Sequence, residues 1–205
     1  RSEASFGWLV SAILQNEKEE VQLAWTRFNA TKPSGKRFFQ GVLRFANWQF
    51  LNGRYRESAD RIKEGILNLT KAMKSGEEDL FELLTRSRIL LAHSLYNIDK
   101  HRGQAAAIFE SLIDLKNPKP ESLSVDLRAQ VNYGLIISRL GIGEFDGAVQ
   151  AADSFLAGFP GDEKAIDVYF WKGEALLMLA RWKEARNAFD KVPAKHKLGA
   201  LATLG

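Results

Sequence analysis

The feature that most constrains the fold of this 205-residue chain is a recurring order of large and small residues. An apolar run with helical spacing is followed by a break and by a second run built around one small residue. The clearest copy contains Tyr169, Gly173, Leu176 and Leu177, then Trp182, Ala185, Phe189 and Val192. A helix pair of this kind cannot bury its apolar face alone, so the copies are expected to stack on one another.

The pattern returns four more times when the second runs are aligned on their central residue. We call these five central positions the anchor residues; they are Val21, Ser58, Ala105, Ala148 and Ala185. Successive anchors lie 37, 47, 43 and 37 residues apart. The spacing predicts five helical pairs, and we expect the longer steps to be filled by long helices around 62–73 and 79–98.

This order of residues resembles the tetratricopeptide repeat (TPR), a pair of antiparallel helices of about 34 residues whose small residues let the helices cross closely. The copy around Val21 lacks the small residue and is interpreted as a divergent capping pair. The resemblance implies an all-α fold, a right-handed α-solenoid of about five hairpins and about eleven helices. The expected units are 4–33, 36–74, 77–117, 121–160 and 162–193, with a further unit starting at 196–205. They would form one domain, 1–205, which we expect to be a fragment of a longer protein.

Breaks in the helical periodicity fall between the expected helices. They are Lys32–Gly35, Asn52–Gly53, Asn117–Pro120, Gly141–Gly143 and Pro160–Asp162. Proline cannot continue a helix because it lacks an N–H and restricts the residue before it. Ser75 and Glu78 have the spacing of a capping box, which predicts a helix start there.

Residues that could carry chemistry are scarce. The three histidines lie far apart in the sequence, none has a second ligand at metal-binding spacing, and His93 is interpreted as a packing residue. Neither a phosphate-binding loop nor a serine nucleophile motif is present. Cysteine is absent, which excludes disulfides and cysteine-based metal sites. We therefore expect a protein that is not an enzyme and has no cofactor.

The segment 21–56 has an unusual composition, with seven basic residues, eight aromatic residues and no acidic residue. Such a segment could hold single-stranded nucleic acid, with bases stacked on the rings, or could attract an acidic partner. The favoured interpretation is that the rings fill the core and the basic side chains lie outside, because aromatic stripes at helical spacing are usually buried.

In the TPR family the first helix of each unit lines a concave groove. The resemblance therefore implies a partner-binding surface made of Gln40, Arg44, Asn47, Ser87, Leu90, Ser94, Gln130, Tyr133, Tyr169 and Lys172. Some members clamp a terminal carboxylate with paired asparagines and lysines. Here Asn47 and Arg44 form one such pairing, but the next unit lacks the matching lysine.

The segment 151–177 looks like bacterial envelope members of this family, such as outer-membrane assembly lipoproteins and the coordinators of the Tol-Pal system. The resemblance rests on Ser154-Phe155-Leu156, Phe159-Pro160-Gly161, Ala165 and Tyr169. It favours the bacterial periplasm. No apolar stretch approaches the 18 residues that a membrane-spanning helix needs.

The leading hypothesis is a non-catalytic interaction scaffold that binds a peptide or helix of a protein partner in the groove. The alternatives are binding of nucleic acid or an acidic partner through 21–56, and an accessory domain of a larger enzyme. Self-association through the end helix is a weaker alternative, since Leu198, Leu201 and Leu204 would otherwise expose an apolar face.

Overall fold

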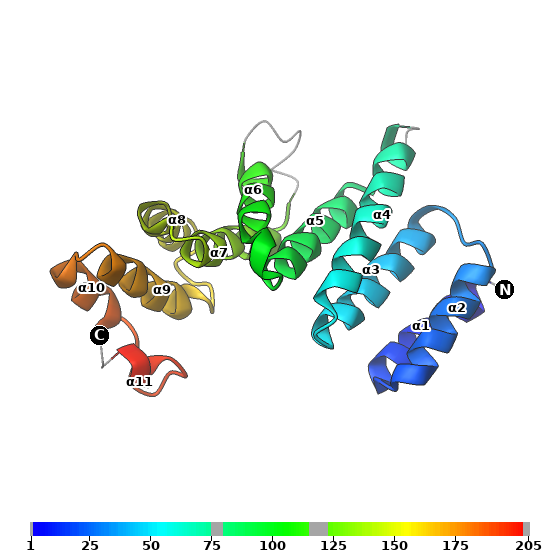
Figure 1. The fold of residues 1–205 in the computed structure, drawn as a ribbon, viewed down its shortest axis with the longest axis horizontal. Coiled ribbons are helices and arrows are strands. Elements are labelled where there is room, and N and C mark those ends of the chain that lie inside the picture. Colours follow the sequence, from blue (N-terminus) through cyan, green and yellow to red (C-terminus); the bar gives the residue numbers. More distant parts are fainter. Residues whose placement is uncertain (1, 75–79, 115–122, 203–205) are drawn as a thin grey trace. The chain divides into compact units, whose positions relative to one another are not determined.

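The computed structural model describes residues 2–74, 80–114 and 123–202 (Figure 1). Within these residues the chain is all-α, with eleven α-helices and one short 3₁₀ helix, as the periodicity predicts. Three predictions lie wholly or partly outside the described residues: the capping box at Ser75 and Glu78, the break at Asn117–Pro120, and the exposed Leu204.

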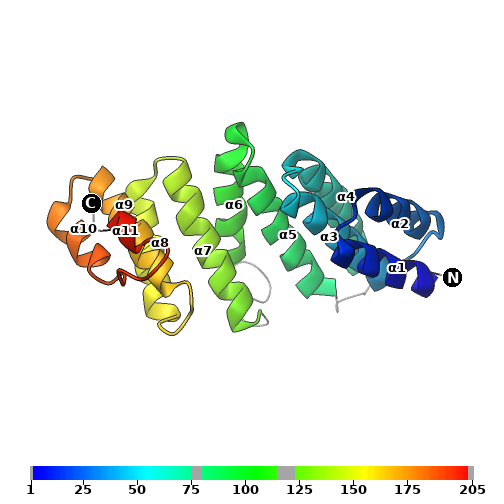
Figure 2. The ribbon, with the colours of Figure 1, turned by 90° about the horizontal axis from the view of Figure 1, so that it is seen from below.

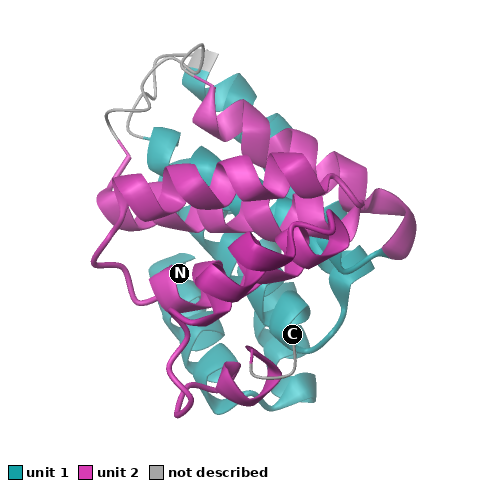
Figure 3. Ribbon diagram, turned by 90° about the vertical axis from the view of Figure 1, so that its left-hand side faces the viewer, with its two compact units in different colours: residues 1–98 teal, residues 99–205 magenta. Residues whose placement is uncertain are grey.

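The chain divides into two compact units, residues 1–98 and 99–205 (Figure 3). The described helices of unit 1 are α1 (Ser2–Gln15), α2 (Lys18–Ala30), α3 (Gly35–Leu51), α4 (Tyr55–Lys74) and α5 (Phe81–Tyr96). Those of unit 2 are the 3₁₀ helix η2 (Asp99–His101), α6 (Arg102–Ile113), α7 (Val125–Gly141), α8 (Phe145–Gly158), α9 (Ala165–Met178), α10 (Trp182–Phe189) and α11 (Gly199–Ala202).

Within each unit, most helices that are next to each other in sequence pack together (Figure 2). In unit 1, α1 packs on α2, and α3 packs on α4, which also packs on α5. In unit 2, each helix from α6 to α9 packs on the next. Four of the five expected pairs are therefore each contained within a single unit, two in unit 1 and two in unit 2. The remaining pair, 77–117, is divided by the boundary between Ile98 and Asp99, and the single domain stays a prediction.

The anchor residues of the second helices are all buried. Each of the five, including Val21 and Ser58, has an exposed fraction of 0%. Burial at one aligned position in every second helix confirms the register that was read from the sequence. Val21 occupies this position although it is larger than the alanines elsewhere.

The turns that join paired helices also repeat. A residue in the left-handed region lies five positions before four of the anchors: Asn16 (φ 59°), Gly53 (φ 73°), Gly143 (φ 81°) and Ala180 (φ 56°). A left-handed residue after the last helical turn is a common way to end a helix. The fifth anchor, Ala105, is preceded instead by η2.

Hydrogen bonds in three of these turns are equivalent. The N–H after the left-handed residue donates to the carbonyl five residues earlier, at 2.9 Å in each case: Arg54 to Gln49, Glu144 to Arg139, and Arg181 to Leu176. This is the Schellman arrangement, which satisfies carbonyls left free at the helix end. One turn geometry therefore sets the path of three hairpins.

Small residues in first helices receive phenylalanine rings from second helices. The rings of Phe28, Phe109 and Phe189 lie against Gly41, Gly134 and Gly173, so closely that a Cβ at each glycine would overlap the ring. These rings are 0–5% exposed. Glycine is needed at these positions for close approach rather than for a special backbone angle.

The extra length of the repeats is located partly where it was expected. Helix α4 has 20 residues and covers 62–73, and α5 covers most of 79–98. In the step from Ala105 to Ala148, α6 ends at Ile113 and α7 begins at Val125, and most of the residues between them lie outside the described part of the chain. At the far end, α11 has only four residues.

Candidate partner-binding site

In unit 1 the expected groove residues of α3 form a stripe along its surface. Arg44 and Asn47 are exposed and Gln40 is half-buried. Their spacing of four and three residues places them on one side of the helix. Within the described part of unit 1, Arg44 makes no ion pair, so its charge is available to a partner.

The expected groove residues of α5 are buried, which corrects that part of the prediction. Ser87, Leu90 and Ser94 are 4%, 7% and 0% exposed. The Ser94 hydroxyl donates to the Leu90 carbonyl at 2.8 Å and lies 3.0 Å from the Ser58 hydroxyl of α4. These side chains stabilise the helix packing and cannot touch a partner.

In unit 2 the two expected residues of α7 reach the surface. Gln130 and Tyr133 are half-buried. The indole N–H of Trp171, on α9, donates to the Tyr133 hydroxyl at 3.2 Å. Burial raises the pKa of Tyr133 above its ordinary value, while this hydrogen bond opposes the shift. The contact identifies the side of α9 that lies beside α7.

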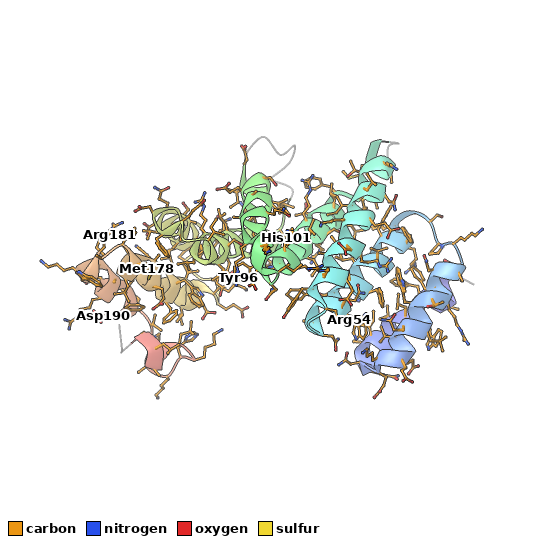
Figure 4. All side chains as sticks on the ribbon, viewed as in Figure 1. Arg54, Tyr96, His101, Met178, Arg181 and Asp190 are labelled. Atoms are coloured by element: carbon orange, nitrogen blue, oxygen red, sulfur yellow. The ribbon has the colours of Figure 1, made fainter. Side chains whose placement is uncertain are left out.

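The expected residues of α9 do not lie on that side. Tyr169 packs against the apolar core of unit 2, and Nζ of Lys172 lies 2.6 Å from Oδ1 of Asp153 on α8. Trp171, which bonds Tyr133, also packs on this core. Met178, at the end of α9, is 65% exposed (Figure 4). Tyr169 and Lys172 are both half-buried, and their role in a groove stays a prediction.

Asp167, at the start of α9, holds the last described segment of the chain. It is 8% exposed. Nζ of Lys197 lies 2.9 Å from its Oδ2, and Nε2 of His196 lies 3.3 Å from its Oδ1. The hydrogen bond to Asp167 raises the pKa of Lys197. Leu198 packs on the same core, whereas Leu201 is 54% exposed.

A cleft of about 630 Å³ opens between the first turns of α7 and the connection from α8 to α9. Val125, Asp126 and Gln130 line one side, and residues 158–164 line the other. Gln130 is the only expected groove residue in this lining. A smaller cleft of about 320 Å³ contains Arg139, which bonds Glu110 and the Gly147 carbonyl and thereby ties α6, α7 and α8 together.

The aromatic rings of the segment 21–56 are mostly in the core, as expected if they fill it. Trp25, Phe28, Phe39, Phe45 and Trp48 are at most 7% exposed. Trp25 stacks on Phe45 with ring centroids 4.5 Å apart, and the guanidinium of Arg61 lies 5.2 Å from the Trp25 ring. These ring faces are therefore unavailable for stacking with bases.

Across the described residues, no three histidine or acidic side chains converge as a metal site would require. None of the described helices is both long and apolar enough to span a bilayer. The sequence matches no protein-family model, and a search of curated proteins found no match.

Proposed function

We propose that this chain is a TPR-like scaffold, a right-handed α-solenoid of helical hairpins that binds a peptide or helix of a partner protein and catalyses no reaction. The observation that carries the proposal is the repeated hairpin: fully buried anchor residues, with the same left-handed turn five positions before four of them. Repeated helical pairs of this kind present their first helices as a preformed binding surface.

Two surfaces support binding rather than a purely structural role. On α3, Arg44 and Asn47 are exposed next to each other along one stripe. On α7 and α9, Tyr133 and Trp171 form a hydrogen-bonded aromatic pair that is only partly buried. Aromatic and arginine side chains are the residue types that carry most binding energy at protein interfaces.

Binding of nucleic acid or an acidic partner is the second candidate. The charge of 21–56 favours it, but five of the eight rings are buried, so electrostatic attraction would be the main contribution. Such binding would weaken steeply with salt because phosphate contacts release counterions. A gel-shift assay that finds no complex with single-stranded nucleic acid at low salt would dismiss the nucleic-acid form.

Two further parts of the proposal concern context. The resemblance of 151–177 to envelope proteins supports a role in a bacterial periplasmic assembly, and an accessory role beside an enzyme domain is compatible with the same scaffold. The sequence of the full-length gene tests both, since a lipoprotein signal would support the first and an adjoining enzyme domain the second.

Site-specific photo-crosslinking tests the scaffold directly. A benzoylphenylalanine would replace Asn47 or Gln130 on first helices, and Lys63 or Asn187 on second helices as controls, since both control residues are exposed. We expect crosslinks to a partner protein from the first-helix positions in the native extract. Equal crosslinking from all four positions, or none from Asn47 and Gln130, would refute the proposal.

A further inference from the structure

The cleft beside α7 has the size of a binding site. Its volume of about 630 Å³ lies inside the range of about 300–1,000 Å³ that small-ligand sites occupy. One wall is helical and the other is the connection from Phe159 to Lys164, which includes Pro160 and Gly161. The Phe155 ring packs on Phe159, with centroids 5.2 Å apart, and helps to fix this connection.

The cleft carries a net negative charge. Asp126, Asp162 and Glu163 line it together with Lys164, so three carboxylates face one ammonium group. Nζ of Lys164 lies 3.2 Å from Oε1 of Glu163 and 3.9 Å from Oδ1 of Asp162, which neutralises one charge. Asp126 is exposed and makes no ion pair within the described part of unit 2. Two negative charges therefore remain for an occupant.

The same cleft exposes apolar surface. Val125, at the first position of α7, is 58% exposed. Pro160 and Phe159 lie on the opposite wall. An occupant that matches the cleft must therefore combine positive charge with apolar atoms.

The local hydrogen bonds argue against an anion. The start of α7 offers free N–H groups, but the Ser124 hydroxyl accepts from the Leu127 N–H at 3.3 Å, and Asp126 lies in the same first turn. At the start of α9, the Lys164 N–H donates to Oδ1 of Asp162 at 2.8 Å. Each helix start is thus already balanced by its own oxygen atoms.

A metal ion is also a poor match, since the described acidic side chains do not converge in threes. Lysine and arginine fit better, because their aliphatic stems pack on apolar surface while their charged ends reach carboxylates. We propose that this cleft binds a segment of a partner protein in which lysine or arginine alternates with apolar residues. The cationic group would lie between Asp126 and the carboxylates of Asp162 and Glu163, which together carry one charge more than Lys164 neutralises. An apolar side chain would lie on Val125.

This inference rests on the proposed scaffold function and is tested with defined peptides and the whole chain. The probes are two fluorescein-labelled peptides in which leucine alternates with lysine or with glutamate. Fluorescence anisotropy should show preferential binding of the lysine peptide, weakening as salt rises. The variant carrying Asp126→Asn and Glu163→Gln should bind it about fivefold to tenfold more weakly, as expected for two exposed charge pairs. Val125→Ser should also weaken binding, through the apolar contact.

A charge-matched control carries Asp99→Asn and Asp190→Asn. Both carboxylates are exposed and neither lines the cleft; Asp190 follows the end of α10 (Figure 4). The control should bind the lysine peptide as the unchanged protein does. Equal loss in both double variants, failure of the lysine peptide to bind, or preference for the glutamate peptide would overturn the proposed site. Photo-crosslinks from Asn47 would persist in those cases if the scaffold function is right, and their loss would count against the scaffold itself.

Discussion

The contact between Gly41 and Phe28 gives the sharpest prediction about stability. Gly41 lies inside α3, and a Cβ there would lie 2.6 Å from Cζ of Phe28 and closer still to Cε1. The ring is 0% exposed. Because its surroundings are packed, the ring cannot move aside without disturbing the core of unit 1.

Two opposing terms set the magnitude for Gly41→Ala. Alanine is favoured over glycine inside a helix by about 0.5–1 kcal/mol, whereas overpacking a core costs about 1–3 kcal/mol. The clash should win, so we expect a net loss of about 1 kcal/mol of unfolding free energy. Gly7→Ala in α1 is the matched control, because nothing lies within 4 Å of a Cβ at Gly7. That change should stabilise by about 0.5–1 kcal/mol.

Urea unfolding followed by far-UV circular dichroism measures both variants. The difference between them isolates the clash, since the helix-propensity term is shared. Combining Gly41→Ala with Phe28→Leu should recover part of the loss, because the smaller side chain leaves room for the added methyl group. If Gly41→Ala were as stabilising as Gly7→Ala, the argument for a close glycine–phenylalanine contact would be wrong.

Three more predictions concern turns, buried hydroxyls and pH. Both Ala180 and Gly143 have a left-handed backbone. Ala180→Gly should therefore stabilise the protein and raise its melting temperature, and Gly143→Ala should destabilise it and lower the melting temperature, each with a change of about 1 kcal/mol in unfolding free energy. Opposite or absent shifts in melting temperature would contradict this. The Ser94 hydroxyl donates its proton to the Leu90 carbonyl, so it must accept the hydrogen bond from Ser58. Ser94→Ala should therefore lower the unfolding free energy measured in urea by about 1–2 kcal/mol, and by more than Ser58→Ala does. Equal losses in the two variants would refute that order. Burial lowers the pKa of His93 from 6.5, so the folded state resists its protonation and stability should fall as pH drops below about 6.5. His93→Gln should flatten that decline, and an unchanged decline in urea midpoints would show that His93 does not cause it.

The sequence predicted the hairpins well because the buried crossing points use distinctive residues. Ala105, Ala148 and Ala185 stand out as small residues among large apolar ones, and all are buried. Gly53 and Gly143 marked two turns correctly. The equivalent turns at Asn16 and Ala180 were missed, because neither alanine nor asparagine signals a left-handed backbone as strongly as glycine does.

Surface residues were predicted less well, because helical periodicity does not say how many sides of a helix are covered. Helix α5 is buried around most of its circumference, so Ser87 and Ser94 lie inside. On α9, the prediction selected Tyr169 and Lys172, whereas Trp171 faces α7. Polar residues such as Ser94 can also form their hydrogen bonds inside the protein, which makes them poor markers of a groove.

The acidic cleft could not be predicted from repeats at all. One of its walls is a connection between helices, and repeat alignment assigns function only to the helices. Its carboxylates, Asp126 and those at 162–163, line one cleft in the fold. They lie more than thirty residues apart in the sequence, so no local sequence pattern connects them.

The fixed interval of five residues between each left-handed turn and the anchor that follows limits how this protein can vary in length. One inserted residue there would rotate the second helix by about 100° relative to the turn. The anchor would then swing out towards water, and a charged or bulky side chain would take its place. Natural length variation should therefore collect in the links between hairpins, and relatives that carry insertions inside a turn would have lost the hairpin.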